Sequence, residues 1–118
     1  MNVLITGDRS LFEQRPFMQR LEGGLKALGI AVDDIHQVVR TAYGGAELRA
    51  QEFAHRYGIP VHQIRIPVGY GKHARFAAMN SAVVHSDVAV IFQTETPCEH
   101  VEHAIKAAQN GEITYVLV

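Results

Sequence analysis

Two acidic residues of this sequence are placed where they could act on a small molecule. Glu47 follows the glycine pair Gly44-Gly45, and Glu99 follows Pro97. Two carboxyl groups that face one another can serve as general acid and general base, for example on an N-glycosidic bond. Each residue is also expected at the start of a helix, where a carboxylate favours the helix dipole without any role in catalysis. The sequence leaves both alternatives open.

The glycine pair and several polar residues predict an anion site. Glycine allows a tight turn from a strand into a helix, and the unpaired N–H groups at the helix start attract phosphate. Arg9 and Arg75 could clamp a phosphate or carboxylate, or lie in solvent. Thr41, Thr94 and Thr96 could donate their hydroxyl groups to the same anion, or hydrogen-bond to the backbone instead.

The residues around His100 give weaker evidence of a functional site. His100 and His103 lie three residues apart with Glu99 and Glu102 beside them. Two histidines do not complete a metal site, so we expect a solvated helix face and no metal. Cys98 is expected to be a small packed group rather than a nucleophile. No cofactor is predicted.

Composition limits the protein class. The 118 residues predict a single domain, 1–118, and the net charge of −1 argues against a protein that grips nucleic acid through its phosphates. No apolar run approaches the 18 residues of a membrane span, and the sequence passes from Met1 into a strand pattern without a leader. We therefore expect a cytoplasmic protein, in agreement with its single cysteine.

Apolar runs alternate with helical stripes along the whole chain. The runs predict strands at 3–5, 35–39, 61–66, 87–92 and 113–118. Between them, apolar residues spaced three and four apart predict helices. These stripes are Phe17, Leu21, Leu25 and Leu28; Ala46, Ala50, Phe53 and Tyr57; Phe76, Met79, Val83 and Val84; and Val101, Ala104, Ile105 and Ala108.

This alternation predicts the α/β class, with a parallel sheet of about five strands covered by helices on both faces. Ligands of such sheets bind at the carboxyl ends of the strands, where the strand order reverses. Three loops, 6–10, 41–47 and 93–98, should therefore meet there, and 72–75 could cover the same crevice.

Several motifs resemble a known superfamily. The chain reads Thr6-Gly7-Asp8-Arg9-Ser10 after its first strand, Gly45-Ala46-Glu47 after its second, and Gly58-Ile59-Pro60-Val61 before its third. A looser motif is Arg75-Phe76-Ala77-Ala78-Met79. In this it resembles the SLOG superfamily, which includes the Smf/DprA proteins and the LOG phosphoribohydrolases, and in particular the small stand-alone bacterial and phage members of the YspA type. The resemblance covers nearly the whole chain.

The resemblance implies a Rossmann-like three-layer αβα sandwich that binds a nucleotide or nucleotide derivative. It places Glu47 on a ribose hydroxyl or a reacting water, and implies a homo-oligomer, a dimer or larger. The family's G-G-x-G-T loop is replaced here by Phe92-Gln93-Thr94-Glu95-Thr96, which favours binding or sensing over catalysis. The expected ligand-binding residues are Thr6, Gly7, Arg9, Thr41, Gly44, Gly45, Ala46, Glu47, Arg75, Thr94 and Thr96.

Two alternatives remain at this point. The first is a nucleotide N-glycoside hydrolase of the LOG type, with Glu47 and Glu99 as catalytic acid and base and Arg75 on the phosphate. The second is a catalytically inactive scaffold or a phage-encoded inhibitor, either of which keeps the fold for contacts with other proteins.

Overall fold

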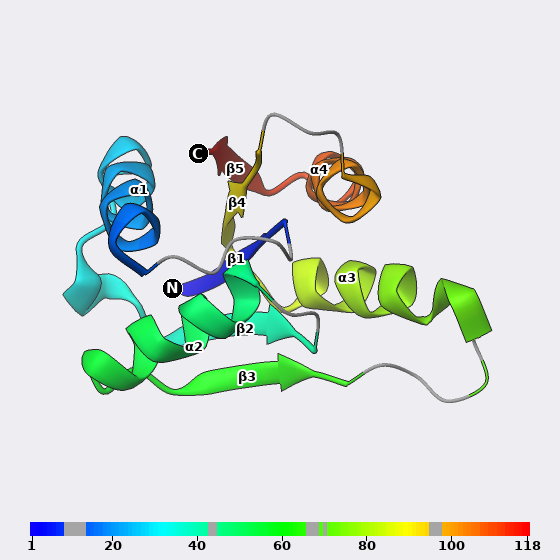
Figure 1. Cartoon of the computed structure of the whole chain (residues 1–118), viewed down its shortest axis with the longest axis horizontal. Helices are drawn as coiled ribbons and strands as arrows, with labels where there is room; N and C mark the ends of the chain where they lie inside the picture. Colours follow the sequence, from blue (N-terminus) through cyan, green and yellow to red (C-terminus); the bar gives the residue numbers. More distant parts are fainter. Residues whose placement is uncertain (9–13, 43–44, 66–68, 70, 95–97) are drawn as a thin grey trace.

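The computed structural model describes residues 1–8, 14–42, 45–65, 69, 71–94 and 98–118. Strands and helices alternate along these ranges (Figure 1). None of the helices in them is both long and apolar enough to cross a membrane. The elements are β1 (Asn2–Gly7), α1 (Gln14–Ala27), β2 (Gln37–Thr41), α2 (Ala46–Arg56), β3 (Val61–Ile64), α3 (Ala74–Val84), β4 (Val88–Phe92), α4 (Glu99–Asn110) and β5 (Thr114–Leu117), with short 3-10 turns at Val32–Asp34 and Gly71–His73.

The five strands form one parallel sheet in the order β3-β2-β1-β4-β5. Helices α1 and α2 cover one face and α3 and α4 the other, so the molecule has three layers (Figure 1). This confirms the predicted α/β class and its Rossmann-like arrangement. The strand order reverses between β1 and β4, because the chain first adds strands on one side of β1 and then on the other.

Each face of the sheet has its own apolar core. Val3 and Ile5 of β1 pack with α1 and α2, whereas Leu4, which points the opposite way, packs with α3 and α4. Phe17 of α1 stacks on Phe92 of β4, with ring centroids 4.2 Å apart. Burial on both faces explains why the central strands are continuous apolar runs.

Some predicted boundaries and core positions are wrong. Strand β2 begins at Gln37 rather than at residue 35, because residues 32–34 form a 3-10 turn that delivers Ile35 to the core from outside the sheet. Tyr57 and Val84, expected on inward stripes, are 44% and 81% exposed. Tyr57 follows the last residue of α2 and Val84 is the last residue of α3, where the helical periodicity no longer fixes the direction of a side chain.

Gly7 ends β1 at the point of reversal, paired with Phe92 of β4. A Cβ atom added at Gly7 would lie 2.4 Å from the carbonyl oxygen of Phe92 and 2.6 Å from its Cβ atom. Any side chain at this position must therefore force the two strand ends apart. Only glycine lets the two backbones meet this closely.

We predict that Gly7→Ala lowers the free energy of unfolding by about 1–3 kcal/mol, the usual cost of overpacking. Gly23→Ala is the matched control, because Gly23 lies within α1 and no atom would come within 4 Å of its new Cβ atom. The control should raise the stability by about 0.5–1 kcal/mol, since alanine favours a helix over glycine. Urea unfolding measures both, and a Gly7→Ala protein as stable as wild type would contradict the close approach.

Candidate functional site

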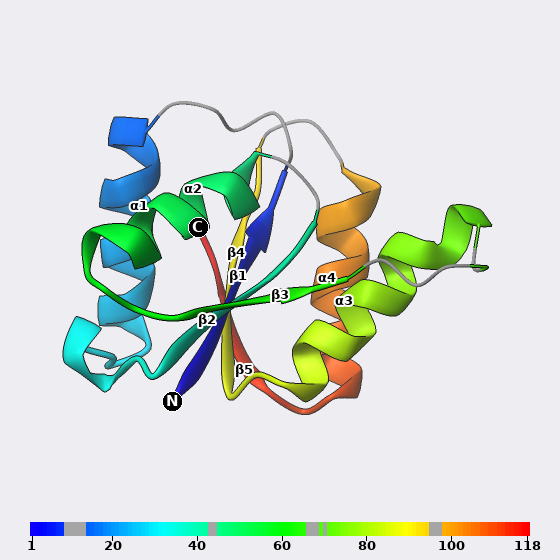
Figure 2. The same cartoon turned by 90° about the horizontal axis from the view of Figure 1, so that it is seen from below.

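The predicted site lies at the edge of the sheet where β1, β2 and β4 end (Figure 2). Thr6 and Gly7 end β1, and Thr41 ends β2. Thr94 follows β4, and α2 begins beside these strand ends with Gly45 as its N-cap residue. The described part of the predicted ligand set therefore gathers at this edge, with the exception of Arg75. Arg9, Gly44 and Thr96 lie outside the described residues.

Glu47 is the central side chain of this edge, and it is fully buried. The backbone N–H of Thr41 donates to Glu47 Oε1 at 2.8 Å, and the Thr41 hydroxyl lies 2.6 Å from both carboxylate oxygens. A buried carboxylate is costly unless donors replace its water. The strand end thus supplies those donors, and the first turn of α2 is fastened to β2.

His100 of α4 completes this arrangement from the opposite layer. Its Nε2 atom lies 3.1 Å from Thr6 Oγ1 and 3.6 Å from Glu47 Oε2, and the side chain is only 2% exposed. The prediction of a solvated face is therefore wrong for His100. The sequence held a signal that could have corrected it, because His100 precedes Ala104 and Ala108 of the apolar stripe by four and eight residues.

The contacts of His100 with Thr6 and Glu47 do not have the geometry of a nucleophile triad. In a triad, the acid and the nucleophile contact different nitrogens of the imidazole ring. Here the Thr6 hydroxyl and the Glu47 carboxylate both lie next to Nε2. The four side chains Thr6, Thr41, Glu47 and His100, which we name the edge cluster, instead connect α2 and α4 to the ends of β1 and β2.

Asp8, which is not among the predicted site residues, connects the other parts of the edge. Its N–H donates to the carbonyl of Phe92 at 3.1 Å, and its own carbonyl accepts the N–H of Ala46 at 3.4 Å. The Thr94 hydroxyl donates to the Asp8 carboxylate at 2.8 Å. The sequence signal that could have identified Asp8 is its position directly after Gly7, the last residue of β1. Because Ala46 already donates to Asp8, the start of α2 offers an anion fewer N–H groups than its sequence suggests.

Glu99 and Arg75 form a separate pair between α4 and α3. Arg75 Nη2 lies 2.8 Å from Glu99 Oε2, and the Glu99 side chain is exposed. The carboxyl groups of Glu47 and Glu99 therefore have different partners in this structure. A shared acid-base role for them stays a prediction.

A buried arginine lies beneath α2. The Nε of Arg40 donates to the carbonyl of Thr41 at 2.9 Å, and its Nη1 donates to the Gln51 side chain. Burial lowers the pKa of Arg40, while the negative charge of Glu47 raises it. Since an arginine stays protonated in proteins, this cation accompanies the buried carboxylate of the edge cluster.

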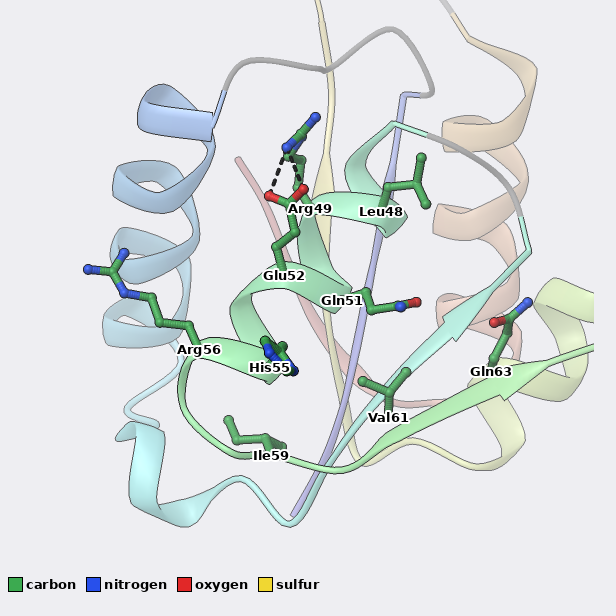
Figure 3. A pocket seen from close by; sticks show the side chains of 9 residues that line it. All are labelled: Leu48, Arg49, Gln51, Glu52, His55, Arg56, Ile59, Val61 and Gln63. Atoms are coloured by element: carbon green, nitrogen blue, oxygen red, sulfur yellow. Dashed lines mark hydrogen bonds and ion pairs between the residues drawn. The ribbon is translucent and has the colours of Figure 1, made fainter.

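The hollows on the surface of the described residues include one of about 700 Å³ that runs between α2 and β3 (Figure 3). We name it the α2–β3 hollow. It carries both signs of charge, and Arg49 and Glu52 pair with each other beside it at 2.6 Å. Its lining residues are Leu48, Arg49, Gln51, Glu52, His55, Arg56, Ile59, Val61 and Gln63, none of which belongs to the predicted site.

The second hollow, about 620 Å³, is lined by Arg20, Gln93, Thr94 and Val118. It includes Thr94 of the predicted site and lies where β4 and β5 end. We name it the β4–β5 hollow. Among the residues that the structure describes, no group of three His, Cys, Asp or Glu side chains is placed to hold a metal ion.

Protein-family models and curated proteins were both compared with the chain, and neither comparison gives a match. The resemblance to the SLOG superfamily thus stays a prediction, and function has to be inferred from the geometry of the edge.

We predict that Glu47→Gln lowers the free energy of unfolding by about 1–3 kcal/mol, because an amide NH₂ would replace one of the two acceptor oxygens beside the Thr41 donors. Glu99→Gln is the matched control. It removes an exposed ion pair and should cost less than about 1 kcal/mol. Equal effects of the two substitutions in urea unfolding would contradict the structural role of the edge cluster.

A pH effect follows from His103. Burial lowers the pKa of His103. The carbonyl of Phe76, which lies 3.2 Å from His103 Nε2, raises this pKa by less than burial lowers it. The unfolded chain therefore binds a proton more readily than the native protein, so the stabilising contribution is present above the ordinary pKa of 6.5 and is lost as the pH falls below it. We expect the stability difference between wild type and His103→Gln to shift against wild type on acidification from about pH 7.5 to 5.5. A difference that does not change with pH would contradict this.

Proposed function

We propose that this protein binds a nucleotide or nucleotide derivative at the carboxyl edge of its sheet and acts as a sensor-like domain of the SLOG type in the cytoplasm. The observation that carries the proposal is the strand reversal between β1 and β4, with Gly7 against Phe92, beside the β4–β5 hollow. Parallel α/β sheets bind ligands at such a point. Thr94 supports the proposal because it lies both at the edge and in the hollow.

Binding without turnover agrees better with the carboxyl groups than hydrolysis does. Glycoside cleavage needs an acid and a base within reach of the same bond. Glu47 is buried against Thr41 and His100, and Glu99 is paired with Arg75. We therefore propose that neither residue acts on the ligand directly and that Glu47 positions the start of α2.

The proposal includes self-association into a dimer or a larger homo-oligomer, as the resemblance implies. Val84 at the end of α3 is 81% exposed and offers an apolar contact there. Light scattering on the purified chain would measure the number of copies, and Val84→Asp should reduce it if this end of α3 lies in the contact.

We predict that at least one nucleotide raises the melting temperature of the protein. A ligand present at 100 times its dissociation constant adds about 2.7 kcal/mol to the stability. The Thr94 hydroxyl donates its proton to Asp8, and its oxygen can still accept a hydrogen bond from the ligand. Thr94→Val removes this acceptor and should weaken binding about 2–10-fold, the value of one hydrogen bond. Gln63→Ala in the α2–β3 hollow is the matched control and should bind as wild type does.

A thermal-shift panel of nucleotides and nucleosides, followed by calorimetry, makes the measurement. No response to any of them would contradict the proposal and favour the scaffold alternative. Release of free base, followed by chromatography, would instead favour the hydrolase. Loss of binding in Gln63→Ala but not in Thr94→Val would move the site to the other hollow.

A further inference from the structure

The guanidinium of Arg20 is fixed at the end of β4 and β5. Its Nη2 atom donates to the main-chain oxygens of Gln93 at 2.7 Å and Val118 at 2.6 Å. The guanidinium also lies 5.2 Å from the ring centroid of Phe92, and that ring is stacked on Phe17. A cation above an aromatic face gains additional attraction. Arg20 is thus held in one orientation by polar contacts on one side and an aromatic ring on the other.

Arg20 also forms part of the wall of the β4–β5 hollow. A guanidinium has five N–H groups on three nitrogens, and both of these hydrogen bonds start from Nη2. The N–H groups on Nε and Nη1 are outside these two bonds. Because the side chain is already ordered, an anion that binds these N–H groups avoids the free-energy cost of ordering a long side chain.

The start of α2 is the competing anion site, and its geometry is less favourable. The N–H of Ala46 donates to the carbonyl of Asp8. The carboxylate of Glu47 also lies at this part of the edge, where it would repel a phosphate. The Asp8 carboxylate, which accepts the Thr94 hydroxyl, adjoins both places and does not distinguish between them. A full positive charge at Arg20 therefore offers a stronger attraction than the partial charge of the helix start.

We propose that Arg20 binds the phosphate group of the ligand in the β4–β5 hollow and makes the protein selective for a nucleoside monophosphate over the uncharged nucleoside. This inference rests on the proposed function and adds to it the place of the phosphate and the residue that recognises it. Thr94 lines the same hollow and donates its hydroxyl proton to Asp8. A single guanidinium among the described lining residues matches one phosphate group, and the N–H groups on its Nε and Nη1 atoms are the donors outside the two bonds of Nη2.

The experiment compares each of AMP, GMP, CMP and UMP with its nucleoside by calorimetry. Wild type should prefer the monophosphate, and Arg20→Gln should lose that preference by about 10–100-fold, the value of a hydrogen bond to a charged group, with nucleoside affinity unchanged. Lys26→Gln is the matched control, because it removes one positive charge from the exposed surface of the same helix. It should keep the preference.

Arg20→Lys provides a second variant if Arg20→Gln does not fold. It keeps the charge and removes the N–H groups on Nε and Nη1 together with the fixed guanidinium plane, so the preference should fall below that of wild type and Lys26→Gln. A preference in either Arg20 variant equal to that of wild type would overturn the inference while the proposed function stands.

No binding of any nucleotide or nucleoside by wild type would contradict the proposed function itself. Equilibrium dialysis with inorganic phosphate then tests Arg20 alone. Phosphate bound by wild type and Lys26→Gln but not by the Arg20 variants would support the anion site. Absence of phosphate binding, or equal binding by all variants, would overturn it.

Discussion

The burial of the Glu47 carboxylate is the constraint on which the candidate site at the edge of the sheet depends. A carboxylate that is fully removed from water must find donors within the protein. It finds them in the N–H and hydroxyl of Thr41, with the His100 ring close by. Because Thr41 ends β2, Glu47 begins α2 and His100 lies on α4, one polar cluster sets the relative positions of three elements from all three layers.

The burial of Glu47 changes how an acidic residue at this helix start is interpreted. A carboxylate at a helix start, next to a glycine turn, has the position of a ligand-contacting group. Its complete burial favours a structural role. Among the residues that the structure describes, Arg20 and Thr94 lie near the end of β4 and keep part of their surface exposed. Our proposal therefore places the ligand nearer to these two residues than to the start of α2, and it favours recognition over bond cleavage.

The meeting of β1 and β4 provides the complementary backbone feature. Gly7 lets the end of β1 lie against Phe92, and the same Phe92 supplies the aromatic face below Arg20. Core packing and the proposed site are thus connected through one side chain, which stacks on Phe17 within the core. A rigid core below a surface hollow is the arrangement that preorganises a binding site.

The sequence by itself determined the α/β class, the alternation of elements and most core positions, because periodicity reports whether a residue faces the sheet or the solvent. It also located the strand ends that carry Thr6, Thr41 and Thr94. The tertiary structure alone decided which polar residues meet: Thr6 contacts a histidine 94 residues away, and Arg20 contacts a carbonyl 98 residues away. Such contacts depend on how distant elements pack, and local spacing carries no information about them.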